Sequence, residues 1–290
     1  MRKLAELAMK GPKQALFLAV LFACIPMVSW LSAAIVSLVV LRRGVDHGLK
    51  VLMWALLPAI AWAAFGQFSV IIGLVATTLL ACVLRQTTSW QSTLLAVVPA
   101  GATIAFGMYQ FAPETIEFMA NAVVGLLKES LPQAGNETLV NKLEAVRPIM
   151  EYGVAGAMAW VHSSFSVLSL MLARSWQAGL YNPGGFGDEF RQVRLSPGVA
   201  MTLLALTLMG SAISPVLTVL LPIASLPLFF SGMAMMHGLV KMGRMSSFWL
   251  IGIYVLLIVL TQLAYPVMVL TACLDSLFDF RKRASIKAQG

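Results

Sequence analysis

Long apolar runs, repeated along almost the whole chain, place the strongest constraint on its fold. The 290-residue sequence is only 11% charged and has a mean hydropathy of +0.86. A helix needs about 20 apolar residues to cross the hydrocarbon core of a bilayer, and its backbone polar groups must bond within the helix. The sequence therefore predicts an all-α polytopic bundle of transmembrane helices, with residues 1–290 forming a single integral membrane domain in a lipid bilayer.

The apolar runs and their interruptions predict seven to nine membrane segments. The runs cover residues 14–41, 49–65, 68–84, 93–111, 149–173, 197–240 and 248–274. Pro26 interrupts the first run, which predicts either one tilted helix or two short ones. The run over 197–240 is long enough for two helices. The last run either crosses once or turns back at Tyr265-Pro266.

The main polar interruption, residues 113–148, predicts an inserted amphipathic segment on the membrane surface at about 113–147. Its first part has apolar residues at helical spacing, with polar residues between them. The apolar positions are Ile116, Met119, Ala120, Val123, Val124 and Leu127. Glutamates outnumber the basic residues here, so we expect this segment to be non-cytoplasmic.

Basic residues outnumber acidic ones, 20 to 12, and lie at the ends of the apolar runs. This distribution is typical of charges that orient a membrane protein and not of a nucleic-acid partner. It predicts a multi-pass protein of the bacterial inner (cytoplasmic) membrane, with a cytoplasmic N-terminus and a cytoplasmic Gly-rich loop at 174–196. The basic C-terminus would then lie outside if the last run crosses once, so its side stays open.

One face of the run over 149–173 is the best candidate for a ligand site. Glu151, His162, Ser166 and Ser169 fall within about 60° of one another on a helical projection, and polar residues inside the membrane are often functional. In the alternative interpretation the serines bond back to their own helix and His162 bonds to a neighbouring helix.

The other polar residues in the runs are isolated and are interpreted as structural. They are Gln110, His237, Gln262 and Tyr265. The three cysteines lie far apart, and no metal site, cofactor site or catalytic constellation is recognisable in the sequence.

Two further patterns predict contacts with partner proteins. The loop 174–196 contains Gly184, Gly185, Phe186, Phe190 and Arg191, and it is either a partner-contacting or gating loop or a plain connector on the membrane surface. Small residues at four-residue spacing, Ala15, Ala19 and Ala23, give the first helix a smooth face. That face packs either against another protein or against helices of the same chain.

Two segments, residues 181–191 and 275–283, resemble the bacterial YybS-like membrane proteins, a domain of unknown function. That family is in turn distantly similar to the S components of energy-coupling-factor transporters. The resemblance implies a ligand pocket toward the outer face, a transmembrane coupling protein that meets Ala15, Ala19 and Ala23, and cytoplasmic ATPases. The chain departs from S components in its greater length, its extra spans and its inserted segment.

The second of these segments ends the chain with Asp275, Asp279, Arg281, Lys282 and Arg283, for which we expect a place at the membrane interface near anionic headgroups. Taken together, the sequence favours a small-molecule-binding transport component with an unidentified ligand. The alternative is a membrane scaffold or assembly factor that acts through protein partners without a ligand. An intramembrane enzyme ranks third.

Overall fold

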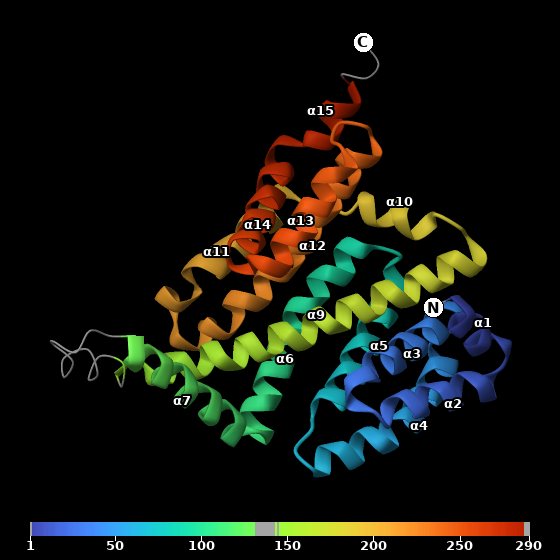
Figure 1. The fold of residues 1–290 in the computed structure, drawn as a ribbon, viewed down its shortest axis with the longest axis horizontal. Coiled ribbons are helices and arrows are strands. Elements are labelled where there is room, and N and C mark those ends of the chain that lie inside the picture. Colours follow the sequence, from blue (N-terminus) through green and yellow to red (C-terminus); the bar gives the residue numbers. More distant parts are fainter. Residues whose placement is uncertain (1, 131–142, 144, 287–290) are drawn as a thin grey trace.

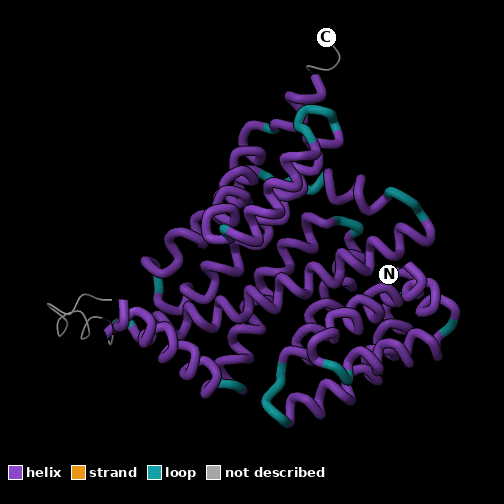
Figure 2. The backbone as a smooth tube through the Cα atoms, viewed as in Figure 1, coloured by secondary structure: helices purple, strands orange, loops and turns teal. Residues whose placement is uncertain are grey.

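The computed structural model describes residues 2–130, 143 and 145–286, and every regular element among them is a helix. Figure 2 shows helices joined by short loops in this part of the chain. The predicted all-α polytopic bundle is confirmed. Part of the inserted segment, including residues 131–142, lies outside the described residues.

The first apolar run folds as two helices. The short α1 (Arg2–Lys10) leads into α2 (Pro12–Ala23), and a 3-10 turn, η1 (Pro26–Val28), precedes α3 (Ser29–Arg43). Pro26 cannot donate a backbone hydrogen bond, so the helix ends just before it and the chain reverses. The helices α2 and α3 then pack on each other as a hairpin.

The middle of the chain supplies three helices of nearly the predicted lengths and then a long one. They are α4 (Val45–Ala64), α5 (Ser69–Thr87), α6 (Trp90–Phe111) and, after the inserted segment, α9 (Arg147–Tyr181). The side chain of Ser89 caps α6 by accepting from the backbone N–H of Ser92. With 35 residues, α9 is about 52 Å long and exceeds the thickness of a bilayer core.

The expected loop at 174–196 is mostly helical, which corrects the prediction. Residues 174–181 continue α9, and a second helix, α10 (Gly185–Arg191), follows the turn at Asn182. Gly184 begins α10 with a φ of 89°, a left-handed conformation that favours glycine. Only the residues flanking α10 form connections.

The remaining apolar runs each divide into two helices. The run over 197–240 forms α11 (Pro197–Ile213) and α12 (Leu220–Lys241), with the 3-10 turn η2 (Pro215–Val219) between them. The run over 248–274 forms α13 (Ser247–Val259) and α14 (Thr261–Phe278). The short helix α15 (Phe280–Ile286) follows α14. The last run does turn back, but at Leu260 and not at Tyr265-Pro266. Pro266 lies inside α14, where one lost backbone bond is tolerated in a membrane helix.

Seven described helices are long and apolar enough to cross a membrane, and three shorter apolar helices, α2, α11 and α13, accompany them. The short helices α2 and α13 each pair with a longer one, α3 and α14 respectively. Both apolar runs therefore return the chain to the side from which it started.

The core of the bundle is α3. Every residue from Leu31 to Leu41 is buried, and the helix packs against α2, α4, α5 and α9. The inserted helix α7 (Pro113–Ser130) buries Ile116 and Ala120, while Met119 and Val123 are exposed. One edge of its apolar face therefore meets the bundle, whereas Met119 and Val123 face outward.

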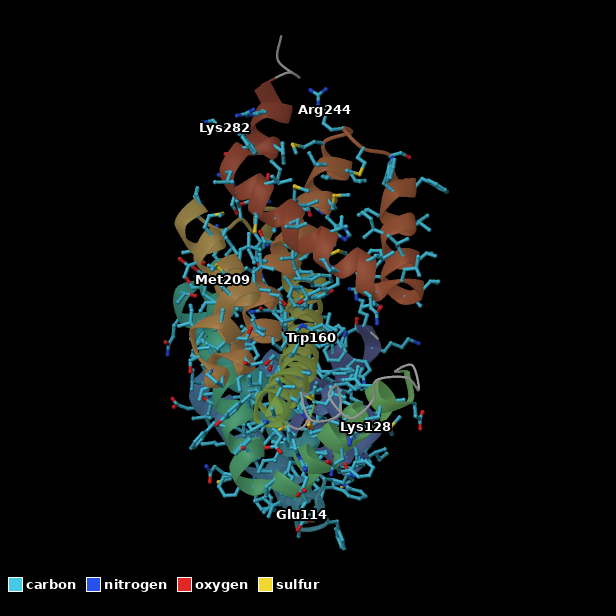
Figure 3. The ribbon with its side chains drawn as sticks, turned by 90° about the vertical axis from the view of Figure 1, so that its left-hand side faces the viewer. Glu114, Lys128, Trp160, Met209, Arg244 and Lys282 are labelled. Carbon is cyan, nitrogen blue, oxygen red and sulfur yellow. The ribbon has the colours of Figure 1, made fainter. Side chains whose placement is uncertain are left out.

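Basic ends of helices gather on one side of the molecule. In Figure 1, α1, α10 and α15 lie along the upper and right-hand edge, whereas α7 lies at the lower left. Figure 3 places Arg244 and Lys282 at the end opposite Glu114, with Trp160 between them. Hydrogen bonds connect the helix ends on this side. Arg85 Nη1, near the end of α5, donates to the carbonyls of Val40 and Leu41, near the end of α3, at 3.1 and 2.6 Å. We call this side the basic end.

Candidate functional site

The largest described cavity, about 750 Å³, is a slot between α9 and the C-terminal helices. We call it the α9–α12 slot. One wall is α9, the floor is α12, and α13 and α14 form the opposite wall, while α10 closes the basic end. Its aromatic lining residues are Trp160, Phe186, Phe190, Phe229, Phe230, Tyr254 and Tyr265. Its volume lies within the usual range of ligand pockets, about 300–1,000 Å³.

The slot is elongated and open at its side. The lining residues of α9 extend from Trp160 to Ser175, which corresponds to about 22 Å along the helix axis. Leu168 and Tyr254 line the slot from facing walls and are 51% and 46% exposed. The helix α13 packs on α12 and α14, so the side of the slot between α9 and α13 opens at the surface of the bundle.

A chain of hydrogen bonds crosses the slot at the end away from α10. Trp160 Nε1 donates to Tyr265 Oη at 2.9 Å, and the hydroxyls of Tyr265 and Ser225 lie 2.6 Å apart. The ring of Tyr265 also stacks on Phe229, with centroids 4.7 Å apart. These contacts join α9, α12 and α14 and satisfy polar groups that would otherwise face apolar surroundings.

A second polar pair lies closer to the basic end. His237 Nε2 and Tyr254 Oη are 2.9 Å apart and link α12 to α13. Phe190 of α10 contacts the edge of the His237 ring at a centroid distance of 5.9 Å. Arg191, next to Phe190, is the charged residue among those that line the slot. The slot therefore has apolar walls, a few hydroxyls, one imidazole and one guanidinium.

The helix α10 is fastened to α9 on one side. Glu189 forms an ion pair with Arg174, and Trp90 Nε1 donates to the same carboxylate at 3.4 Å. Both side chains of the ion pair are largely shielded, and Phe186 adds a tilted contact with Trp90 at 5.8 Å. This anchoring holds Phe186 and Phe190 at the end of the slot.

The C-terminal motif fastens α10 on the other side. Arg281 Nη1 donates to the carbonyl of Arg191 at 2.7 Å, and its Nη2 forms a 2.7 Å ion pair with Asp275. Asp275 is 1% exposed and also accepts from the backbone N–H of Phe280 at 3.1 Å. Asp275 and Arg281 therefore form a buried clamp, and their expected place at the membrane interface stays a prediction.

Arg194, three residues after the segment 181–191, also bonds to the segment 275–283. Its guanidinium pairs with Asp279 at 2.9 Å and donates to the carbonyls of Asp275 and Ser276 at 3.2 and 3.0 Å. Asp279 has a φ of 49°, which ends α14 and turns the chain into α15. The remaining two residues of the motif lie on α15, where Lys282 N donates to Asp279 Oδ1 and Arg283 lies over the Phe278 ring.

The predicted ligand face of α9 lies away from this slot. Glu151, His162, Ser166 and Ser169 line none of the described cavities, and on a helical projection His162 is about 160° from Trp160. Ser166 Oγ donates to the carbonyl of His162 at 2.9 Å, as the structural interpretation predicted. Ser169 is buried.

Glu151 is also separated from His162 along the helix, by about 16 Å. It belongs to a cluster at the α7 end, where Arg147 lies 3.5 Å from it and Tyr109 donates to it at 3.4 Å. Arg147 also pairs with Glu117 of α7 at 3.1 Å. The four residues share a helical face but do not converge on one site, and a ligand-binding role for them stays a prediction.

The two predicted partner-contact patterns have different environments. Ala15, Ala19 and Ala23 are each 0% exposed because α2 packs on α3 and α4, and Ser32 donates to the Ala19 carbonyl at 2.6 Å. Contact with a coupling protein stays a prediction that would require α2 to leave these neighbours. In the second pattern, the exposed Gly184 precedes α10, the half-buried Gly185 begins it, and the other three members line the slot.

Sequence reasoning treated His237 and Tyr265 as isolated, and it did not single out Trp160 or Ser164. These residues come together because α9, α12 and α14 are neighbours in space, which no spacing within one helix reveals. Among the described residues no group of three or more His, Cys, Asp or Glu side chains is placed to hold a metal ion. No family model, curated protein or solved structure matches the chain.

Proposed function

We propose that this protein binds a small, lipid-like amphiphile within the membrane and serves as the binding component of a transport system. The observation that carries the proposal is the α9–α12 slot, a cavity of about 750 Å³ that opens sideways between α9 and α13. A molecule that dissolves in the bilayer can enter such a slot without crossing water. Multi-pass membrane residence supports this route.

The lining of the slot suits a ligand with an apolar body and a polar group. Apolar and aromatic side chains form most of the walls, and the hydroxyl of Tyr265 and the imidazole of His237 are spaced along it. A few placed polar groups in an apolar cavity are what orient a small molecule and give specificity. The lining hydroxyls of Ser164 and Thr261 donate to backbone carbonyls and not to a base, so we favour binding over chemistry.

The side of the membrane is also part of the proposal. The positive-inside rule places the basic end in the cytoplasm of a bacterial inner membrane, together with the N-terminus, α10 and α15. The helix α7 then lies outside. Membership of the YybS-like family and a distant relation to S components, with a coupling protein and ATPases as partners, belong to the same hypothesis.

Filling the slot tests the proposal. Ser164 lines the slot on α9, and a Ser164→Phe substitution places a ring inside it. Ala157 lies on the same helix, is exposed and lines none of the described cavities, so Ala157→Phe is the matched control. Mass spectrometry of small molecules that remain bound after gentle extraction should find a ligand in the wild type and in the control, and less of it in Ser164→Phe.

A ligand retained equally by all three proteins would contradict binding in the slot. The alternative function, a scaffold that recruits proteins without a ligand, is favoured by one observation: Ile253 is the buried residue of α13, and apart from the half-buried Leu250 and Leu257 its other apolar side chains are exposed. A scaffold would retain no small molecule, and its partner would crosslink to α13 in the wild type and in both variants.

A further inference from the structure

The charge inside the α9–α12 slot is concentrated at one point. Arg191 is the charged residue among its lining residues, and it lies at the basic end, on α10. The other charged groups nearby are already engaged: Glu189 pairs with Arg174, and Arg281 pairs with Asp275 and bonds to the Arg191 carbonyl. The slot therefore has one cationic end and a long apolar body.

Arg191 forms an ion pair in which another anion can replace the carboxylate. Its Nη2 lies 2.5 Å from Asp188 Oδ1, three residues earlier on α10. The Asp188 side chain is 67% exposed, whereas that of Arg191 is 26% exposed. Pairs with such exposure contribute little to stability, so a second anion that reaches Arg191 from the slot can replace the Asp188 carboxylate.

We infer that the slot takes a long-chain amphiphile with an anionic phosphate or carboxylate head, which Arg191 binds. The inference rests on the proposed function and names the substrate class of the same site. A guanidinium presents paired N–H donors that match a phosphate or carboxylate, and His237 and Tyr254 lie nearby as further hydrogen-bonding groups.

The length and the opening of the slot fit the chain of such a molecule. Its lining along α9 extends for about 22 Å from Trp160, in the middle of the bundle, to Ser175 near the basic end. With its head at Arg191, a single extended chain runs along α9 toward Trp160. The sideways opening between α9 and α13 lets that chain enter from the bilayer.

Paired probes that differ only in their heads test the inference. Full-length protein in neutral detergent is titrated with hexadecyl phosphate and with hexadecanol, and binding is measured by native mass spectrometry. We expect hexadecyl phosphate to bind about tenfold or more tightly than hexadecanol, because hydrogen bonds to a charged group are the stronger ones. Inorganic phosphate serves as the competitor that has a head but no chain.

Two substitutions on α10 give opposite expected results. Arg191→Gln should remove the preference for the phosphate head, and Arg191→Lys should restore part of it. Asp188→Asn removes the competing carboxylate and should raise the affinity for hexadecyl phosphate. A purely structural ion pair would instead make Asp188→Asn and Arg191→Gln equally harmful. Lys13→Gln removes one exposed positive charge outside the slot and should change neither affinity.

The outcomes separate the inference from the proposed function. If both probes bind equally and Ser164→Phe abolishes both, the slot binds amphiphiles but the anionic class is overturned. If inorganic phosphate displaces hexadecyl phosphate at equal concentration, the alkyl chain contributes nothing to binding. The inference that the ligand is an amphiphile is then overturned. If Ser164→Phe affects neither probe, binding lies elsewhere and the proposed function fails as well.

Discussion

Two helical hairpins, one near each end of the chain, arise from similar apolar runs but pack very differently. In α3 every residue from Leu31 to Leu41 is buried, whereas Ile253 is the buried residue of α13. The helix α3 has α2, α4, α5 and α9 as neighbours, while α13 packs on α12 and α14. The apolar character of a run thus determines that it enters the membrane, and the number of neighbouring helices determines whether it faces protein or lipid.

The sparse packing of the second hairpin has a functional counterpart. The α9–α12 slot lies where α13 stands apart from α9, whereas the described cavity that reaches α3, at Leu41, has about half its volume. A binding site requires space that a fully packed core does not leave. The N-terminal hairpin therefore supports the bundle, and the C-terminal hairpin provides a wall of the site.

The largest expected difference between the two ends of the chain concerns their ion pairs. Asp275→Asn leaves the shielded Arg281 without its counter-charge and should lower the free energy of unfolding by about 3–5 kcal/mol. Its matched control, Glu6→Gln, breaks a pair whose side chains are 75% and 46% exposed and should cost about 0–1 kcal/mol. Denaturation in detergent micelles measures both, and equal losses would refute the buried clamp.

Truncating one isoleucine in each hairpin tests the contrast in packing directly. Ile35 is 0% exposed, so Ile35→Ala should cost about 2–5 kcal/mol through lost contacts and a cavity. Ile258 is 82% exposed, so Ile258→Ala should change stability by less than about 0.5 kcal/mol. The same micelle assay applies. A large loss in Ile258→Ala would mean that α13 is covered by something other than lipid.

Adding a methyl group should have opposite signs in the two regions. A Cβ at Gly48, where α4 faces α3, would lie 2.1 Å from Val40 Cγ2 and 3.1 Å from Val40 Cα, so Gly48→Ala should cost about 1–3 kcal/mol. At Gly252 in α13 a Cβ meets nothing within 4 Å, and Gly252→Ala should stabilise the helix by up to about 1 kcal/mol. If the melting temperatures of Gly48→Ala and Gly252→Ala shift in the same direction, the two regions do not differ in packing as described.

The sequence predicted the helices well and their arrangement incompletely. Apolar runs located α4, α5 and α6 to within a few residues, because helix length and hydropathy are local properties. The turn at Leu260 was placed five residues too late, since proline is a strong local signal but is tolerated inside membrane helices. With α13 and α14 antiparallel, the basic C-terminus returns to the side of Lys241, and the conflict over its location disappears.

The candidate site was less predictable because it depends on which face of α9 meets protein. A helical projection grouped His162 with Ser166, but the face with Trp160 and Ser164 lines the slot. Likewise, no local pattern indicated that Arg281, paired with the nearby Asp275, would also bond to the carbonyl of Arg191, because that second contact joins residues 90 positions apart. Contacts between distant segments are set by tertiary packing and leave no local pattern.

The smallest expected effect concerns how firmly α13 is attached. A hydrogen bond between Tyr254 Oη and His237 Nε2 links α13 to α12, so Tyr254→Phe should cost about 0.5–1.5 kcal/mol or less. Because few other contacts hold α13, its backbone amides should exchange with deuterium faster in the variant, while those of α3 stay unchanged. Tyr181→Phe is the control, since Arg42 contacts the ring of Tyr181 at 3.9 Å and the substitution keeps that ring. Unchanged exchange in α13 would mean that its apolar contacts with α14 suffice to hold this wall of the slot, and that the two hairpins differ in burial but not in local stability.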